Sequence, residues 1–172
     1  MMGLLLFYFA AAVTVAGAVG VVVLPNPLYS VLSLIASFLG LAGLYLSLNA
    51  EFIAVVQVVV YAGAIMVLFL FVVMLLDMRR EERIPLRLPV QKFAGAILGV
   101  GIFTILVKVF SSDVLLTGAK GTFTAERVSE MGNTQVIGRI LLTDYLLPLQ
   151  AMGVLLFVGV IGAVVLAKRR TG

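Results

Sequence analysis

The sequence has 172 residues, of which 63% are hydrophobic and 12% charged, and its mean hydropathy is +1.23. So little polar surface cannot cover a water-soluble globule, which excludes that class and makes the lipid bilayer the expected environment. The chain has no Cys and no His, so thiolate chemistry, iron-sulfur ligation and the usual haem and zinc sites are not expected on it. The net charge of +4 does not indicate binding to nucleic acid, because the basic residues cluster beside apolar segments.

Five apolar segments have the length of a helix that crosses a bilayer. They cover residues about 2–24, 28–48, 52–76, 92–110 and 145–167. In hydrocarbon each segment must satisfy its own backbone hydrogen bonds, and the segments lack the alternating pattern of barrel strands. We therefore predict an all-α integral membrane protein, with five transmembrane helices in one membrane domain over residues 1–172.

The first segment carries no Lys or Arg before its apolar core, so we expect a retained helix and not a signal peptide. Small residues four positions apart, Ala12, Ala16 and Gly20, lie in this segment, and Gly159 lies in the last one. Small residues on one face allow helices to approach closely, so these four are predicted packing positions. Short polar turns before the second and third segments make the first three helices antiparallel neighbours.

The third segment, EFIAVVQVVVYAGAIMVLFLFVVML from Glu51 to Leu75, carries the polar residues of interest. Glu51 stands at its start, where it either faces a polar path or is a carboxylate favoured by the helix dipole. Gln57 and Tyr61 are i and i+4, so they share one face of a regular helix. That face is either a hydrated seam or a site of polar pairing between helices. Glu51, Gln57 and Tyr61 are therefore candidates for a proton path or for coupling.

Small residues thin the same helix just beyond its middle, at Ala62, Gly63 and Ala64. One interpretation is ordinary close packing against another helix. The other is a π-bulge, an inserted residue in the helical ladder, which glycine favours and which occurs at functional positions. We name Tyr61, Ala62, Gly63 and Ala64 as the candidate hinge.

The basic residues predict the orientation of the chain in the membrane. One side collects eight of the twelve, from a predicted cytoplasmic loop over residues about 77–91 and from the tail: Arg79, Arg80, Arg83, Arg87, Lys92, Lys168, Arg169 and Arg170. The other side has Lys108, Lys120, Arg127 and Arg139. By the positive-inside rule the N-terminus faces out and the C-terminus is cytoplasmic.

The predicted external connection, residues about 111–144, is the one sizeable polar segment. VLLTGAKGTFTA is typical of a small β-hairpin, and GNTQVIGRILLTDY of an interfacial helix leading into the last span. Thr143 or Asp144 is the expected N-cap of that span, which puts Pro148 where a helix tolerates it.

These residues resemble a known family. The third segment, with its Glu-Phe start and its Val-Tyr-Ala-Gly-Ala core, is similar to the third helix of subunit J of respiratory complex I, the proton-pumping NADH:quinone oxidoreductase. The mitochondrial counterpart of that subunit is chain 6. IGRILLTDYLLPLQAMGVLLFVGVIGAVVLAKRR resembles the same family's last helix, and the match covers most of the chain.

The resemblance implies a multi-pass, non-catalytic subunit in a bacterial plasma membrane, packed against the small subunit K and near subunits H and A. It implies a π-bulge near Tyr61 and Gly63, whose conversion to regular helix opens or closes a water path. NADH, FMN, iron-sulfur clusters and quinone are implied in the whole complex, with no catalytic, cofactor or metal site on this chain. Many relatives have Glu where this chain has Gln150, so a charge-carrying role there is not expected.

Two other functions are open at this point. An independent small transporter would usually show paired halves and binding groups at the membrane midplane, which five unequal spans fit poorly. A structural scaffold or assembly subunit would need the small-residue faces but neither Gln57 and Tyr61 nor a labile third helix. The sequence shows no nucleophile beside a base and no phosphate loop, so nothing in it indicates catalysis by this chain alone.

Overall fold

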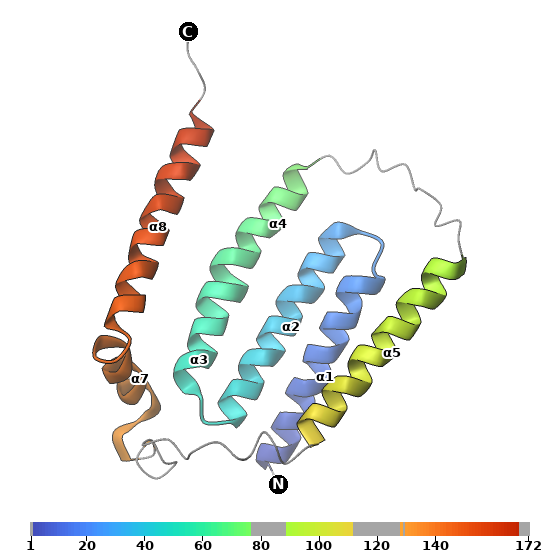
Figure 1. The fold of residues 1–172 in the computed structure, drawn as a ribbon, viewed down its shortest axis with the longest axis horizontal. Helices are drawn as coiled ribbons and strands as arrows, with labels where there is room; N and C mark the ends of the chain where they lie inside the picture. The colour runs from blue at the N-terminus through green and yellow to red at the C-terminus, as the bar shows by residue number, and fades with distance from the viewer. Residues whose placement is uncertain (1, 77–88, 112–127, 129, 169–172) are drawn as a thin grey trace. The chain divides into compact units, whose positions relative to one another are not determined.

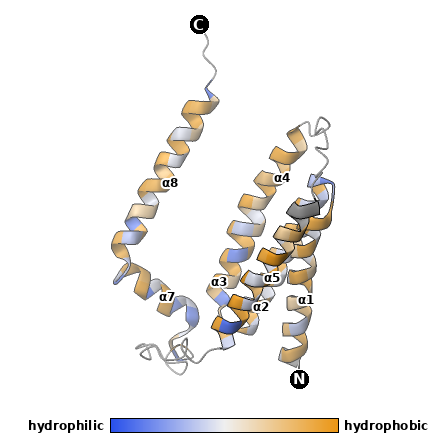
Figure 2. Cartoon of the chain, turned by 45° about the vertical axis from the view of Figure 1, so that its right-hand side comes forward, coloured by the Kyte–Doolittle hydropathy of each residue, from blue (hydrophilic) through white to orange (hydrophobic). Residues whose placement is uncertain are grey.

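A computed structural model describes residues 2–76, 89–111, 128 and 130–168, and this part of the chain is helical without strands (Figure 1). Five of its helices are long and apolar enough to cross a membrane: Gly3–Val23, Pro27–Ser47, Glu51–Leu75, Phe93–Ser111 and Leu146–Ala167. Their surfaces are hydrophobic almost throughout (Figure 2). The prediction of an all-α protein with five membrane-spanning helices is confirmed.

Helices α1 (Met2–Val23) and α2 (Pro27–Ser47) form a tight antiparallel pair. Asn26 caps α2, because its Oδ1 accepts from the Leu28 N–H at 2.9 Å, and Pro27 follows at the first helical position. A Cβ built on Gly17 would lie 2.7 Å from the Ser33 carbonyl oxygen, so only glycine allows this separation of the two backbones. The Ser37 hydroxyl donates to the Thr14 carbonyl at 2.9 Å and joins the pair by a polar contact.

The turn after α2 is a Schellman motif centred on Asn49. The Ala50 N–H donates to the Tyr45 carbonyl at 2.9 Å, and the Asn49 N–H donates to the Leu46 carbonyl at 3.1 Å. Asn49 has φ of 56°, the left-handed conformation that this motif requires and that Asn tolerates better than most residues. The turn reverses the chain within three residues and starts the third span beside α2.

The third span contains three consecutive pieces. Helix α3 (Glu51–Val56) leads into η1 (Gln57–Ile65), and η1 continues as α4 (Met66–Leu75). Figure 1 shows them as one rod, and each piece contacts α2 along its length. This rod carries the candidate hinge.

The last two helices of the described chain are α7 (Asn133–Leu142) and α8 (Leu146–Ala167). Helix α7 matches the helix expected before the last span. The N-cap of α8 is Tyr145, without a side-chain hydrogen bond, so the expectation of Thr143 or Asp144 as its cap is wrong. Thr143 is instead the C-cap residue of α7, and its hydroxyl donates back to the Arg139 carbonyl at 2.9 Å.

The chain forms two compact units, residues 1–75 with 125–172 and residues 76–124. The second unit contains α5 (Pro89–Ser111), an apolar helix whose glycines 95, 99 and 101 have open space around them. The predicted hairpin, residues 114–125, and most of the predicted loop over 77–91 lie outside the described residues. One membrane domain over residues 1–172 stays a prediction, as does the orientation.

Candidate functional site: the π-helix of the third span

A nine-residue π-helix, η1, occupies the middle of the third span. In a π-helix each N–H donates to the carbonyl five residues back, one further than in an α-helix. The last such bond at its end runs from the Met66 N–H to the Tyr61 carbonyl. The predicted irregularity of the third helix is therefore confirmed, and Tyr61, Ala62, Gly63 and Ala64 all lie within it.

The burial pattern shows the effect of the extra residue. Ala54, Gln57 and Ala62 are buried, at 3%, 6% and 6% exposed, and Met66 and Leu70 are half-buried. The spacing along this face is three or four residues, as in an α-helix, except for the five residues between Gln57 and Ala62. A regular helix would place Ala62 about 140° around the axis from Gln57. The π-helix is what brings both residues to the same buried face.

Gln57 is a polar side chain on that buried face. Of the described helices outside its own span, α2 is the one that packs on η1. No hydrogen bond joins the Gln57 amide to another of the described residues, and no fully buried side-chain nitrogen or oxygen among them lacks a partner. The Gln57 side chain is therefore buried, while its amide keeps a small accessible surface that a polar molecule such as water can reach.

Tyr61 lies one turn beyond Gln57 but is 46% exposed. Its ring packs edge to face on Phe38 of α2, with ring centroids 5.9 Å apart. The prediction that Gln57 and Tyr61 share one face assumed a regular helix. In the π-helix Ala62 takes the inner position, and Tyr61 stands at the edge of the contact with α2.

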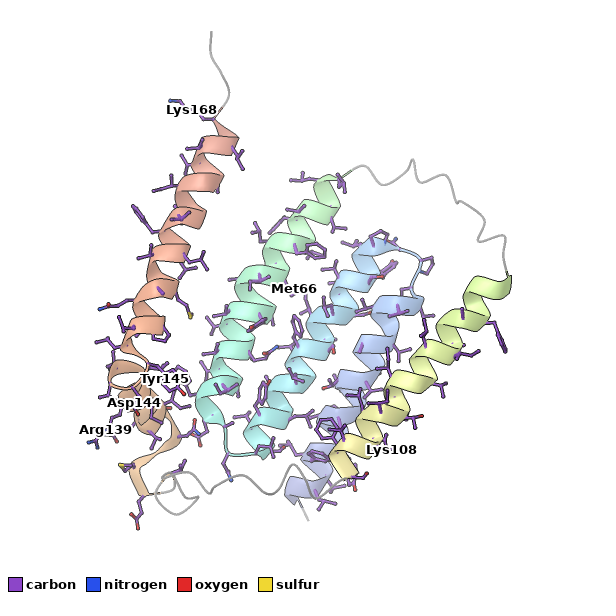
Figure 3. All side chains as sticks on the ribbon, in the orientation of Figure 1. Met66, Lys108, Arg139, Asp144, Tyr145 and Lys168 are labelled. Atoms are coloured by element: carbon purple, nitrogen blue, oxygen red, sulfur yellow. The ribbon has the colours of Figure 1, made fainter. Side chains whose placement is uncertain are left out.

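Gly63 lies on the exposed side of η1. A Cβ built there would lie 3.1 Å from the Val58 carbonyl oxygen, the acceptor five residues back, and would meet nothing else within 4 Å. The glycine therefore relieves crowding inside the π-helix itself and does not serve packing on another helix of the described chain. Met66, labelled in Figure 3, is the residue at which the α-helical ladder resumes.

Glu51 is exposed and lies in the first turn of α3, where a carboxylate is favoured by the helix dipole. The Ala50 side chain cannot cap this helix, and the Asn133 side chain of α7 accepts from the Phe52 N–H instead. Neither Asn133 nor Phe38 was expected from the sequence. Each acts on the third span from a distant part of the chain, and no local pattern marks it.

A comparison with protein families gives a match to the model of NADH-ubiquinone/plastoquinone oxidoreductase chain 6 over residues 17–166. The chain belongs to this family. It is thus a membrane subunit of an NADH-quinone oxidoreductase and, with its five apolar helices, a multi-pass protein of the inner membrane.

Three relatives of the chain 6 family illustrate the extent of the match. NADH-quinone oxidoreductase subunit J of Rickettsia felis is 36% identical over 170 residues, which is 96% of this chain and 81% of the relative. NAD(P)H-quinone oxidoreductase chain 6 of Synechocystis is 39% identical over 165 residues, 95% and 79% of the two chains. NAD(P)H-quinone oxidoreductase subunit 6 of the organellar chromatophore of Paulinella chromatophora is 37% identical over 166 residues, which is 96% of this chain and 78% of the relative.

The predicted helix-packing residues and Gln150 lie at the following places in the structure. Gly20 faces α2, since a Cβ there would lie 2.8 Å from the Ser33 hydroxyl. Ala12, Ala16, Gly159 and Gln150 are exposed within the described chain. The contact face of α1 runs instead through Ala10, Thr14 and Gly17. Packing at Ala12, Ala16 and Gly159 stays a prediction.

Polar side chains lie at the two ends of α8. Figure 3 shows Arg139, Asp144 and Tyr145 where α7 meets α8, and Lys168 at the opposite end. The described residues include no group of three or more His, Cys, Asp or Glu that could hold a metal ion. The polar groups that the π-helix presents are the Gln57 amide and the Tyr61 hydroxyl, and both can donate and accept hydrogen bonds.

Proposed function

We propose that this subunit helps couple quinone reduction to proton translocation through a change of register in η1, with a water path beside Gln57 and Tyr61. The observation that carries the proposal is the buried Gln57 side chain within a π-helix, whose amide has no hydrogen-bond partner among the described residues. A polar group inside the membrane is costly unless it is paired or hydrated, so such a group is a candidate functional site.

A π-helix and an α-helix both satisfy every internal backbone group, so one can convert to the other without exposing unpaired amides to lipid. The conversion removes one residue from the turn and rotates everything beyond it by about 100°. Tyr61 and Ile65 would then take the inner positions that Ala62 and Met66 occupy here. The change replaces Ala62, one turn beyond Gln57, with the much larger Tyr61, and farther along it replaces the flexible Met66 with the stiffer, β-branched Ile65. The larger Tyr61 side chain would close a water-filled space beside Gln57.

The surroundings of this helix are part of the same proposal. Contact with subunits K, H and A would cover exposed apolar faces of the chain, and the N-terminus would face out with the C-terminus in the cytoplasm. NADH, FMN, iron-sulfur clusters and quinone would be bound by other subunits. Membership in the oxidoreductase family leaves no reason to favour an independent transporter.

The test is Gln57→Leu in the purified complex and in sealed membrane vesicles. Leu has a similar volume, so we expect normal assembly and normal NADH oxidation with an artificial acceptor. Loss of the amide should lower the number of protons moved per NADH oxidised by quinone. A conservative control is Val58→Leu, at the exposed position next to Gln57. Unchanged proton stoichiometry in Gln57→Leu would favour a purely structural subunit.

A further inference from the structure

The start of the third span is capped by a residue far away in the sequence. The first amides of a helix have no partner within that helix, and Ala50 at the N-cap has no acceptor to offer. Asn133 Oδ1 accepts from the Phe52 N–H at 3.4 Å, across 81 positions of the chain. One orphan amide of α3 is therefore satisfied from α7.

A buried apolar residue lies one turn from this hydrogen bond. Asn133 is the first residue of α7, and Val136, one turn later, is 6% exposed. Helix α7 contacts α3 within the same unit of the chain. The turn of residues 143–145 then leads directly into α8. Helix α7 thus attaches the start of the third span to the last span.

The residue that precedes α3 is also held by a hydrogen bond. The Ala50 N–H donates to the Tyr45 carbonyl of α2 at 2.9 Å in the Schellman turn. Two neighbouring amides, at positions 50 and 52, are therefore held by two different helices. Only residues 53–56 lie between the held amide of Phe52 and the start of the π-helix at Gln57.

We infer that Asn133 is a positioning residue that anchors the start of the third span, so that a change of register is taken up by η1 and α4 and not by slippage of α3. The consequence for coupling depends on the function proposed above. The anchoring of α3 does not depend on that function, because it rests on the hydrogen bond and on the contact between α7 and α3.

The first experiment measures hydrogen exchange of the amides of residues 52–54 in the purified complex. Asn133→Ala removes the acceptor and should speed exchange by about twofold to tenfold, the effect of one net hydrogen bond. Asn133→Asp keeps an acceptor of the same reach and should exchange as the parent protein does. Thr134→Ala changes an exposed neighbour on α7 and should also have no effect. Parental exchange in Asn133→Ala overturns the anchor.

The second experiment measures protons moved per NADH in the same variants. Asn133→Ala should lower this ratio, and Asn133→Asp should restore it, which a general loss of stability would not do. Faster exchange with an unchanged ratio overturns the positioning role. Since exchange is read without turnover, it judges the anchor independently of the Gln57→Leu result that judges the proposed function.

Discussion

The Tyr61 ring meets the Phe38 ring edge to face, with centroids 5.9 Å apart and 75° between the ring planes. This geometry suits the quadrupoles of two aromatic rings and adds to their apolar contact. The pair joins η1 to α2 at the irregular part of the third span. A register change that carries Tyr61 inward must break or rearrange it.

Two substitutions at Tyr61 should distinguish the contribution of its hydroxyl from that of its ring. Tyr61→Phe keeps the ring pair, so we expect parental thermal stability and a modest loss of coupled turnover. Tyr61→Leu loses the pair as well and should cost about 0.5–1.5 kcal/mol. A double-mutant cycle with Phe38→Leu, read from the thermal stability of the complex, measures the coupling. Strictly additive single effects would contradict the contact, and unchanged pumping in Tyr61→Phe would remove the hydroxyl from the mechanism.

Gly63→Val should change the register preference of η1. The Cβ would lie 3.1 Å from the Val58 carbonyl oxygen, closer than an ordinary contact, and the β-branch restricts the side chain further. We expect a cost of about 1–3 kcal/mol and a larger fall in pumping than for Tyr61→Phe. Ala64→Val, at the next exposed position of η1, is the matched control. Normal pumping by assembled Gly63→Val complex would end the hinge hypothesis.

The five spans could be predicted because long apolar runs and polar turns are local signals. The π-helix was predicted from Gly63 and from the resemblance to a family. Its effect on which residues are buried was not predicted. Regular periodicity placed Tyr61 on the same face as Gln57, whereas one extra residue in this turn places Ala62 there instead. Regular helical spacing predicts the wrong buried residues when the position of the inserted residue is unknown.

The packing face of α1 was not predictable for a different reason. The helix is apolar on all sides, so hydrophobicity does not separate a face toward α2 from a face toward lipid. Spacing of four selected Ala12 and Ala16, while the contact follows Ala10, Thr14 and Gly17. The cap from Asn133 to Phe52 was out of reach altogether, since only the folded chain brings them together.

Asn49 should tolerate glycine and reject β-branched residues. Its φ of 56° lies in the left-handed region, where Gly has no steric penalty and Val is a strained outlier. Asn49→Gly should leave the thermal stability of the complex unchanged, and Asn49→Val should lower it by about 1–3 kcal/mol. Ala50→Val, the next residue along, controls for bulk. Equal stability of Asn49→Val and the parent protein would show that the turn adopts another conformation.

Gly17→Ala should force α1 and α2 apart. The new Cβ would lie 2.7 Å from both the Ser33 carbonyl oxygen and the Ser37 amide nitrogen, which are backbone atoms and cannot turn aside. Separation of the helices would also stretch the bond from the Ser37 hydroxyl to the Thr14 carbonyl, now 2.9 Å.

We expect Gly17→Ala to cost about 1–3 kcal/mol and to reduce the amount of assembled complex in the membrane, measured by native gel electrophoresis. Gly3→Ala, in the same helix with nothing within 4 Å, should assemble normally. Because a Cβ would meet backbone atoms of α2 at Gly17 and nothing at Gly3, equal assembly of both variants would contradict the close approach of α1 and α2.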